Sequence, residues 1–217
     1  FCYAEAPLSP TVDASWVAED LMALEPTEAS GMPTLVAEAL GGKSVVRFDG
    51  ASALYIPATA SPISGATAFT VAVVFRVDED GVDENAYAGG LGLVSSKQTI
   101  DNAPDFVLSW RNEGTVGAGY GATDGNVPLF SFKPCRLADG EGHVAVFSAD
   151  PIEGVMRIMT DGCLVSRPLS ANEVRGDYPI CIGALKPGEG FFKGDIAAMK
   201  LAARALSENE MRTLSEA

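Results

Sequence analysis

The chain carries little positive charge. Its 217 residues include 15 Lys and Arg against 29 Asp and Glu, which gives a net charge of −14 and a pI of about 4.4. An acidic surface repels phosphate backbones and anionic lipid headgroups, so nucleic acid is not expected as a partner. The charge is typical of a well-solvated surface, and it also allows a requirement for Ca²⁺.

Long apolar runs are also missing. No segment approaches the ~18 consecutive apolar residues of a membrane span, so membrane insertion is not expected. The chain begins at Phe1 rather than Met. This start is compatible with a cleaved signal peptide or with a trimmed N-terminus.

Histidine occurs once, and the cysteines follow no metal-binding pattern. Any Ser-His-Asp triad or Cys-His dyad would have to use His143. The chain has no nucleophile-elbow motif, so a structural role is favoured for this histidine. The four cysteines, Cys2, Cys135, Cys163 and Cys181, include no C-x-x-C spacing, which argues against a zinc site. Three disulfide pairings are possible, and free buried thiols fit a domain of this size equally well.

Glycine and proline, by contrast, are plentiful, which favours many short strands joined by turns. The strongest period-two pattern lies at 69–77 and places Phe69, Val71, Val73, Phe75 and Val77 on one face. The opposite face carries Thr70, Ala72, Val74 and Arg76, so it is less polar than a fully solvated face. Further strands are predicted at 44–48, 53–56, 106–110, 115–121, 143–149, 155–160, 163–166, 178–183 and 196–201.

Turn and helix signals complete the pattern. The loop 150–154 contains Pro and Gly, and Asp161-Gly162 supplies positive φ angles, so both predict hairpins. Ser207 and Glu210 form a capping box that predicts a short C-terminal helix. Residues 14–24 have room for one or two helical turns. Many antiparallel strands with regular turns predict an all-β sandwich or barrel, which we expect to be a single domain over 1–217.

Three stretches, in this order, resemble the laminin-G-like branch of the concanavalin A-like lectin/glucanase superfamily. They are Arg47–Gly50 followed by the strand at 69, Leu137–Val146 followed by the Asp161-Gly162 hairpin, and Phe192–Ala197 followed by Arg204–Glu210. The resemblance covers roughly residues 40 to 215. It implies a jelly-roll β-sandwich of two antiparallel sheets, and it implies function only loosely because one fold hosts many functions. Members bind sugars, proteins or Ca²⁺.

The same superfamily contains glucanases, so hydrolysis has to be considered. Retaining glycosidases of this fold place two carboxylates ~5 Å apart, which a strand supplies through an E-x-D-x-x-E motif. No Glu in this chain is followed two residues later by Asp. We therefore expect that the protein is not an enzyme.

Candidate ligand-binding residues are aromatic or rich in oxygen. Tyr87, in the acidic loop 78–90, Tyr120 and Trp110 are candidates for stacking on a sugar. For Trp110, the alternation with Phe106 and Leu108 is more typical of a core residue. One candidate Ca²⁺ site consists of Asp101, Asn102 and Asp105. A second cluster comprises Asp78, Asp80, Asp83 and Asn85.

The sequence and the resemblance together predict an extracytoplasmic, non-catalytic binding module. Carbohydrate is the favoured ligand class, so the expected partner is a glycan or a surface protein. One alternative is a structural or protein-interaction spacer without a small ligand. A divergent glycoside hydrolase is a third reading. Apart from a possible Ca²⁺, no cofactor is expected.

Overall fold

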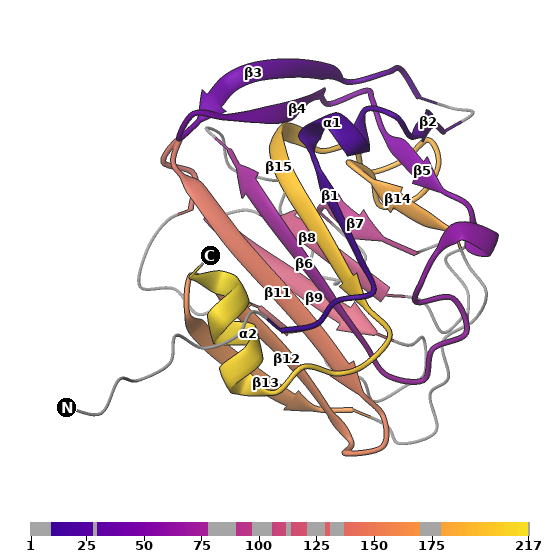
Figure 1. Ribbon diagram of the computed structural model, residues 1–217, viewed down its shortest axis with the longest axis vertical. Coiled ribbons are helices and arrows are strands. Elements are labelled where there is room, and N and C mark those ends of the chain that lie inside the picture. Colours follow the sequence, from indigo (N-terminus) through magenta and orange to yellow (C-terminus); the bar gives the residue numbers. More distant parts are fainter. Residues whose placement is uncertain are drawn as a thin grey trace.

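Two antiparallel β-sheets form the body of the protein, as seen in a computed structural model (Figure 1). The structure describes residues 10–27, 30–77, 90–96, 106–111, 114–120, 129–130, 137–169 and 179–216. Within these residues, sheet A contains β1 (Ala14–Val17), β3 (Thr34–Leu40), β4 (Lys43–Asp49), β6 (Phe69–Arg76), β11 (Gly142–Asp150), β12 (Val155–Thr160), β13 (Cys163–Pro168) and β15 (Lys193–Ala202). Sheet B contains β2 (Glu25–Pro26), β5 (Leu54–Ile56), β7 (Leu91–Ser95), β8 (Phe106–Arg111), β9 (Thr115–Tyr120), β10 (Leu129–Phe130) and β14 (Ile180–Ile182).

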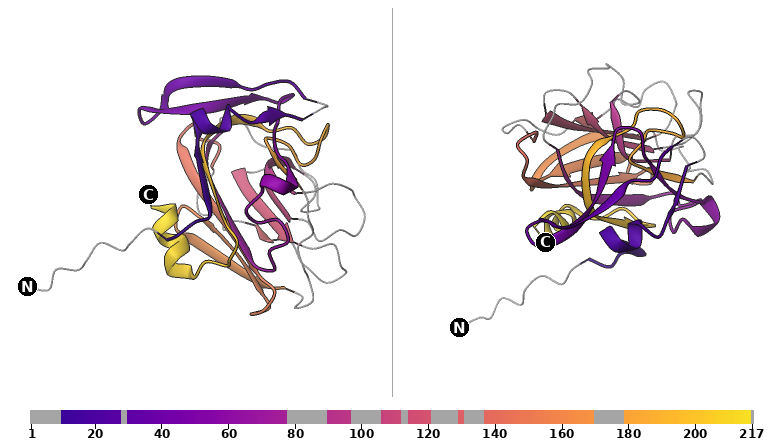
Figure 2. Two further views of the ribbon diagram at one scale, coloured as in Figure 1. Left: turned by 45° about the vertical axis from the view of Figure 1, so that its right-hand side comes forward. Right: turned by 90° about the horizontal axis from the view of Figure 1, so that it is seen from above.

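The strand orders show how distant segments are brought together. Sheet A runs β13-β12-β11-β6-β15-β4-β3, and β1 also pairs with β15. Sheet B runs β10-β9-β8-β7-β14-β5-β2. The two sheets lie face to face (Figure 2). The helices are short: α1 (Ala18–Leu21), the 3₁₀ turn η1 (Ala58–Ala60) and α2 (Glu208–Ser215). The predicted all-β sandwich is therefore confirmed.

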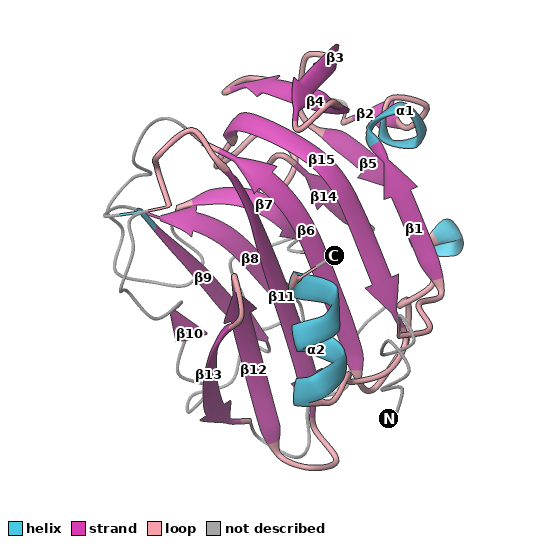
Figure 3. Ribbon diagram, turned by 60° about the vertical axis from the view of Figure 1, so that its left-hand side comes forward, coloured by secondary structure: helices cyan, strands magenta, loops and turns pink. Residues whose placement is uncertain are grey.

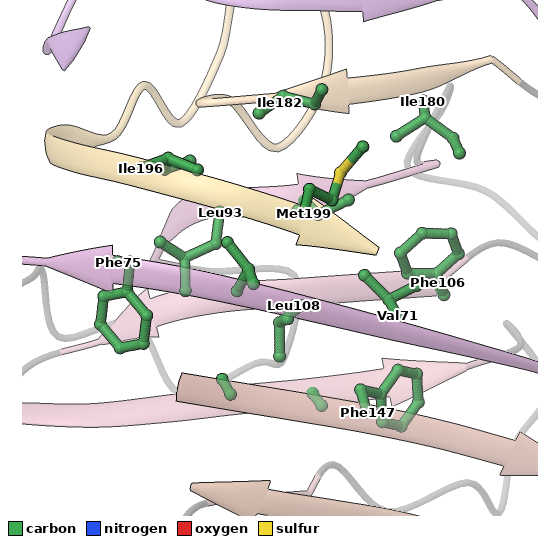
Figure 4. Packing of buried hydrophobic residues seen from close by; sticks show 14 of the residues in the cluster. Val71, Phe75, Leu93, Phe106, Leu108, Phe147, Ile180, Ile182, Ile196 and Met199 are labelled. Atoms are coloured by element: carbon green, nitrogen blue, oxygen red, sulfur yellow. The ribbon is translucent and has the colours of Figure 1, made fainter. Parts of the chain in front are cut away.

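The core lies between the sheets and is built from alternate residues. On β6, the side chains of Phe69, Val71, Val73 and Phe75 are at most 1 % exposed and belong to the main core cluster. The Phe69 ring lies 5.0 Å from the Phe106 ring and 5.9 Å from the Phe147 ring, so residues of both sheets meet around it. Figure 4 shows side chains of the two sheets packed together. The alternation predicted for residues 69–77 is confirmed.

The opposite face of β6 is partly covered by the C-terminal helix (Figure 3). Leu206, Met211 and Leu214 pack against Ala72 and other residues of sheet A in a second apolar cluster. This cover explains why the outer face of β6 is less polar than a fully solvated face. The capping box is present, because Glu210 N donates to Ser207 Oγ and Ser207 N donates to Glu210 Oε2.

Both predicted hairpins are present, and so is a short helix near the N-terminus. Asp161 and Gly162 have φ angles of 47° and 79°, as a tight turn with two positive φ angles requires. Residues 14–24, expected to hold one or two helical turns, contain the four-residue α1, which is about one turn. The segment before it, Ala14–Val17, forms a strand that was not predicted, because it hydrogen-bonds to residues 198–201 of β15.

Two of the stretches that carry the family resemblance, those with Arg47 and Asp195, meet in a partly buried ion-pair cluster. Arg47 Nε and Nη2 donate to the two oxygens of Asp195 at 2.8 and 3.0 Å, and Arg76 Nη2 also donates to that carboxylate. Burial raises the pKa of the Asp195 carboxyl, but hydrogen bonds from Arg47 and Arg76 outweigh burial, so the pKa lies below its ordinary value. The cluster joins β4, β15 and β6.

We expect the substitution Phe147→Ala to lower the free energy of unfolding by about 3–5 kcal/mol, because it leaves a cavity beside Phe69. Ile152→Ala is the matched control, since its side chain is 81 % exposed in the β11–β12 loop and should change stability by less than about 0.5 kcal/mol. Urea denaturation measures both. Equal effects of the two substitutions would contradict the assigned core.

The Asp195 cluster predicts an acid-sensitive contribution to stability. A carboxyl whose pKa is lowered on folding stabilises the protein above its unfolded pKa of about 3.9, and that stability is lost as the pH falls through the folded pKa. Asp195→Asn should therefore destabilise the protein at neutral pH and approach the wild type in acid. The exposed Glu25→Gln substitution is the control. Denaturation midpoints measured against pH check this, and a constant difference between wild type and Asp195→Asn would contradict it.

Candidate functional site

An open groove crosses the outer face of sheet A and has a cavity volume of about 570 Å³. Its floor includes a row of aliphatic residues from four neighbouring strands: Val144 of β11, Val74 of β6, Ala198 of β15 and Val17 of β1. These residues stand opposite one another in the strand register. The row runs across the strands, so four segments far apart in the sequence contribute to one surface.

The groove lies between two elements that rise from the sheet. On one side lie the β3–β4 turn, which contributes Gly42, and the start of β4, which contributes Lys43 and Ser44. On the other side lies α2, which contributes Leu214. Arg76 Nη1 donates to Ala39 O at 2.7 Å and so ties the end of β3 to the outer face of the sheet. In Figure 3, β3 and β4 form the upper end of sheet A, and α2 lies over the lower part of the sheet at β11 and β12.

The groove combines an apolar floor with a polar rim. Its charged lining residues among those described are Lys43, Lys200 and Glu19. A hydrogen bond with the Ser44 side chain lowers the pKa of Glu19. No aromatic or amide side chain occurs among the described lining residues. The groove therefore offers aliphatic contact area, two ammonium groups, a carboxylate and serine hydroxyls.

The outer side of sheet B is closed over its middle strands. Ser109 and Arg111 of β8 and Cys181 of β14 point away from the core by alternation, yet each is at most 4 % exposed. Part of the cover is the segment 184–190: Ser95 Oγ donates to Leu185 O, and Gly92 N donates to Gly190 O at 2.9 Å. A Cβ atom at Gly92 would lie 2.2 Å from Ala184 C, so only glycine fits there.

The structure places two of the predicted sugar-binding aromatics in the core. Trp110 is 1 % exposed and its ring lies 6.0 Å from that of Phe75. Tyr120 is fully buried and its ring lies 5.1 Å from that of Phe69. Both rings face the opposite sheet, because the alternation of β8 and β9 turns them inward. Neither can stack on a ligand from solvent.

The remaining predicted ligand residues lie outside the described part of the chain. They are Tyr87, the Ca²⁺ candidates Asp101, Asn102 and Asp105, and the second cluster Asp78, Asp80, Asp83 and Asn85. They stay predictions. Among the residues that the structure describes, no three His, Cys, Asp or Glu side chains are arranged to hold a metal ion.

His143 lies between two carboxylates and beside an aromatic ring. Its Nδ1 is 2.7 Å from Asp161 Oδ2, and its Nε2 is 2.9 Å from Asp139 Oδ1. The hydrogen bond with Asp161, supported by that with Asp139, raises the pKa of His143 against the opposing effect of burial. The two nitrogens lie on different sides of the ring, so the carboxylates do not converge on one point. This geometry joins two turns together.

The cysteines that the structure describes are free thiols. Cys181 is buried, and burial raises the pKa of its thiol to about 12, which keeps it protonated. Cys163 is partly exposed. Cys2 and Cys135 lie outside the described residues. None of the described helices has the length and apolarity needed to span a membrane.

Comparison with known proteins decides the family. A laminin G family model described as the concanavalin A-like lectin/glucanases superfamily matches residues 48–212. The chain belongs to this superfamily. The match includes most of the stretches from which the resemblance was inferred, and it places Asp195, Arg76 and the floor residues Val74, Val144 and Ala198 within the family domain. No curated protein matches the chain significantly.

Solved structures share the fold at low sequence identity. Domain 4 of AbnA, an extracellular GH43 arabinanase from Geobacillus stearothermophilus, in complex with arabinotriose, has a TM-score of 0.64 and 12 % identity, covering 94 % of this chain and 89 % of that one. The CBM40 of the Ruminococcus gnavus IT-sialidase bound to α2,3-sialyllactose has a TM-score of 0.59 and 17 % identity, covering 79 % and 96 %. A SAP-like pentraxin from Limulus polyphemus has a TM-score of 0.57 and 14 % identity, covering 80 % and 82 %.

Sequence reasoning missed the groove. None of its floor residues was a candidate ligand residue, because valine and alanine on a strand signal only local structure. The one signal was the weakly polar outer face of β6, which includes Val74. That signal does not distinguish a face covered by a helix from a face open to a ligand.

Proposed function

We propose that this chain is a non-catalytic carbohydrate-binding module that acts outside the cytoplasm, and that the groove on sheet A binds the glycan. The observation that carries the proposal is this open groove across four strands, in a fold shared with modules solved in complex with arabinotriose and sialyllactose. At 12–17 % identity the likeness supports the fold, and the site is inferred from the groove itself.

The dimensions of the groove suit an extended ligand. Neighbouring strands lie about 4.8 Å apart, so the row from Val144 to Val17 spans roughly 14 Å. A ligand of several linked sugar units can lie along such a row and contact more than one strand at once. A groove open to solvent also allows both ends of a longer glycan to extend beyond it.

The chemistry of the groove suits a molecule with both apolar and hydroxyl groups. The aliphatic floor can pack against the C–H groups of sugar rings, although without the stacking that an aromatic ring provides. The rim supplies donors from Lys43 and Lys200, an acceptor from Glu19, and hydroxyls from Ser15 and Ser44. A mostly apolar surface with a few polar groups is common in binding sites.

The non-catalytic part of the proposal rests on the carboxylates. Glycoside hydrolysis ordinarily needs two carboxyl groups placed across the scissile bond. Among the described lining residues of the groove, Glu19 is the single carboxylate, and it is paired with Ser44. The described surroundings of the groove therefore support binding rather than hydrolysis.

A protein-interaction module is the second candidate function. The aliphatic floor and the lack of an aromatic ring among the described lining residues favour it, because an extended peptide can set apolar side chains on such a row. Screening the protein against a glycan array and against a random peptide library distinguishes the two functions.

The proposal predicts saturable binding to at least one glycan class on an array that includes sialyllactoses and arabinotriose. Parallel arrays with added Ca²⁺ and with EDTA test whether an ion takes part. If no glycan binds in either buffer while a random peptide library yields a groove-dependent ligand, the protein-interaction function replaces the present proposal.

Variants then test the location of the site. Ala198→Arg places a long side chain in the middle of the groove floor and should weaken glycan binding by about tenfold or more, measured by titration calorimetry. Asn209→Arg is the matched control, because it adds the same side chain at an exposed position of α2 that does not line the groove. Glycan binding that survives Ala198→Arg unchanged would move the site elsewhere.

A further inference from the structure

We propose that Asp139, His143 and Asp161 form a pH-controlled clamp that holds two turns of sheet A together when the histidine is protonated and releases them when it is not. The clamp adjoins the groove, because Val144 of the groove floor follows His143 in the chain and its N donates to Asp161 Oδ1. His143 is the second residue of β11, Asp139 lies in the turn that precedes this strand, and Asp161 lies in the β12–β13 turn.

The hydrogen-bond geometry requires two protons on one ring. The ring nitrogens of His143 lie 2.7 and 2.9 Å from carboxylate oxygens. An ionised carboxylate only accepts hydrogen bonds, and a neutral imidazole donates through one nitrogen only. Only the imidazolium form donates to both carboxylates at once. Loss of one proton leaves a ring lone pair facing a carboxylate, which breaks one of the two contacts.

Each carboxylate also accepts a hydrogen bond from the main chain. Asp161 Oδ1 accepts from Val144 N at 2.8 Å, and Asp139 Oδ1 accepts from Glu141 N at 2.9 Å. The turn that holds Asp161 is the attachment point of α2 as well, because Arg212 Nη1 donates to Gly162 O at 3.2 Å. The clamp therefore fixes the turn to which the C-terminal helix is tied.

The other groups packed around His143 do not replace its charge. From β6 comes the Phe75 ring, whose centre lies 5.9 Å from that of the histidine. Arg76, opposite Gly142 in the register, donates to Asp195 and to Ala39 O. From α2, Arg212 contacts the Gly162 carbonyl and Glu208. Glu141 is exposed on the neighbouring turn. The imidazolium is thus the cation placed between the two carboxylates.

The direction of the pH effect follows from the raised pKa of His143. A group whose pKa rises on folding stabilises the protein below its unfolded pKa of about 6.5, and this stability is lost as the pH rises through the folded pKa. His143 is the only histidine, so no other side chain ordinarily titrates between about pH 5 and 8. The clamp is closed below the folded pKa of His143 and opens as the pH rises above it.

The test is an NMR titration of the His143 ring in the full chain, together with melting temperatures at about pH 5 and about pH 9. We expect a His143 pKa above about 6.5 and a lower melting temperature at the higher pH. Asp161→Asn keeps a turn-forming residue and an oxygen for Val144 N but removes the charge, so it should lower the His143 pKa. His143→Gln should flatten the stability difference between the two pH values.

Asp150→Asn is the matched control. Asp150 also caps a hairpin loop of sheet A, where its Oδ1 accepts from Ile152 N and Glu153 N, but it does not contact His143. It should leave the His143 titration unchanged. A wild-type His143 pKa at or below about 6.5, or an equal pH dependence in wild type and His143→Gln, overturns the clamp. Because the NMR titration reports on the ring directly, general destabilisation by Asp161→Asn does not obscure the result.

Discussion

The burial of alternate residues between two sheets is the constraint on which the rest of this structure depends. Strand β6 lies near the middle of sheet A, and its inward side chains, from Phe69 to Phe75, pack against sheet B. Because side chains alternate along a strand, burying that set leaves Val74 and its neighbours on the outer face. A shift of one residue would exchange the two faces. The core therefore determines which residues are left to form a surface groove.

The outer faces of the two sheets differ because different segments cover them. Sheet A carries α2 over one part of its outer face and the end of the β3–β4 hairpin over another, and the aliphatic row between them stays open. Sheet B is closed over β7 by the segment that contains Leu185 and Gly190. A ligand that approaches the described part of the chain meets an open surface on sheet A. Function thus depends on which elements fold back over each sheet as well as on the sandwich itself.

The buried charges have a structural role in this arrangement. Asp195 joins three strands through two arginines, and His143 joins two turns through two aspartates. Asp195 meets partners that are distant along the chain, whereas His143 meets the nearby Asp139 and, across the hairpin, Asp161. The stretches that carry the family resemblance thus mark scaffold contacts. This explains why they identify the superfamily while giving little information about a ligand.

Much of the fold could be predicted from local patterns. The alternation at 69–77, the Asp161-Gly162 turn and the Ser207–Glu210 capping box depend on residues close together in the chain, and local chemistry suffices to recognise them. The pairing of Ala14–Val17 with β15 could not be recognised, because a short segment of mixed polarity becomes a strand only when a partner edge is available. The strand β3 was missed for the same reason, since its exposed and partly exposed residues show no clear alternation.

The sequence by itself determined the class of fold, the hairpins and the C-terminal helix, because each follows from the spacing of apolar residues and from turn chemistry. Only the tertiary structure decided the burial of Tyr120, the position of His143 between two carboxylates, and the groove. Each of these depends on residues brought together from separate strands or turns. The groove is the clearest case, since Val17, Val74, Val144 and Ala198 become neighbours only through strand order and register.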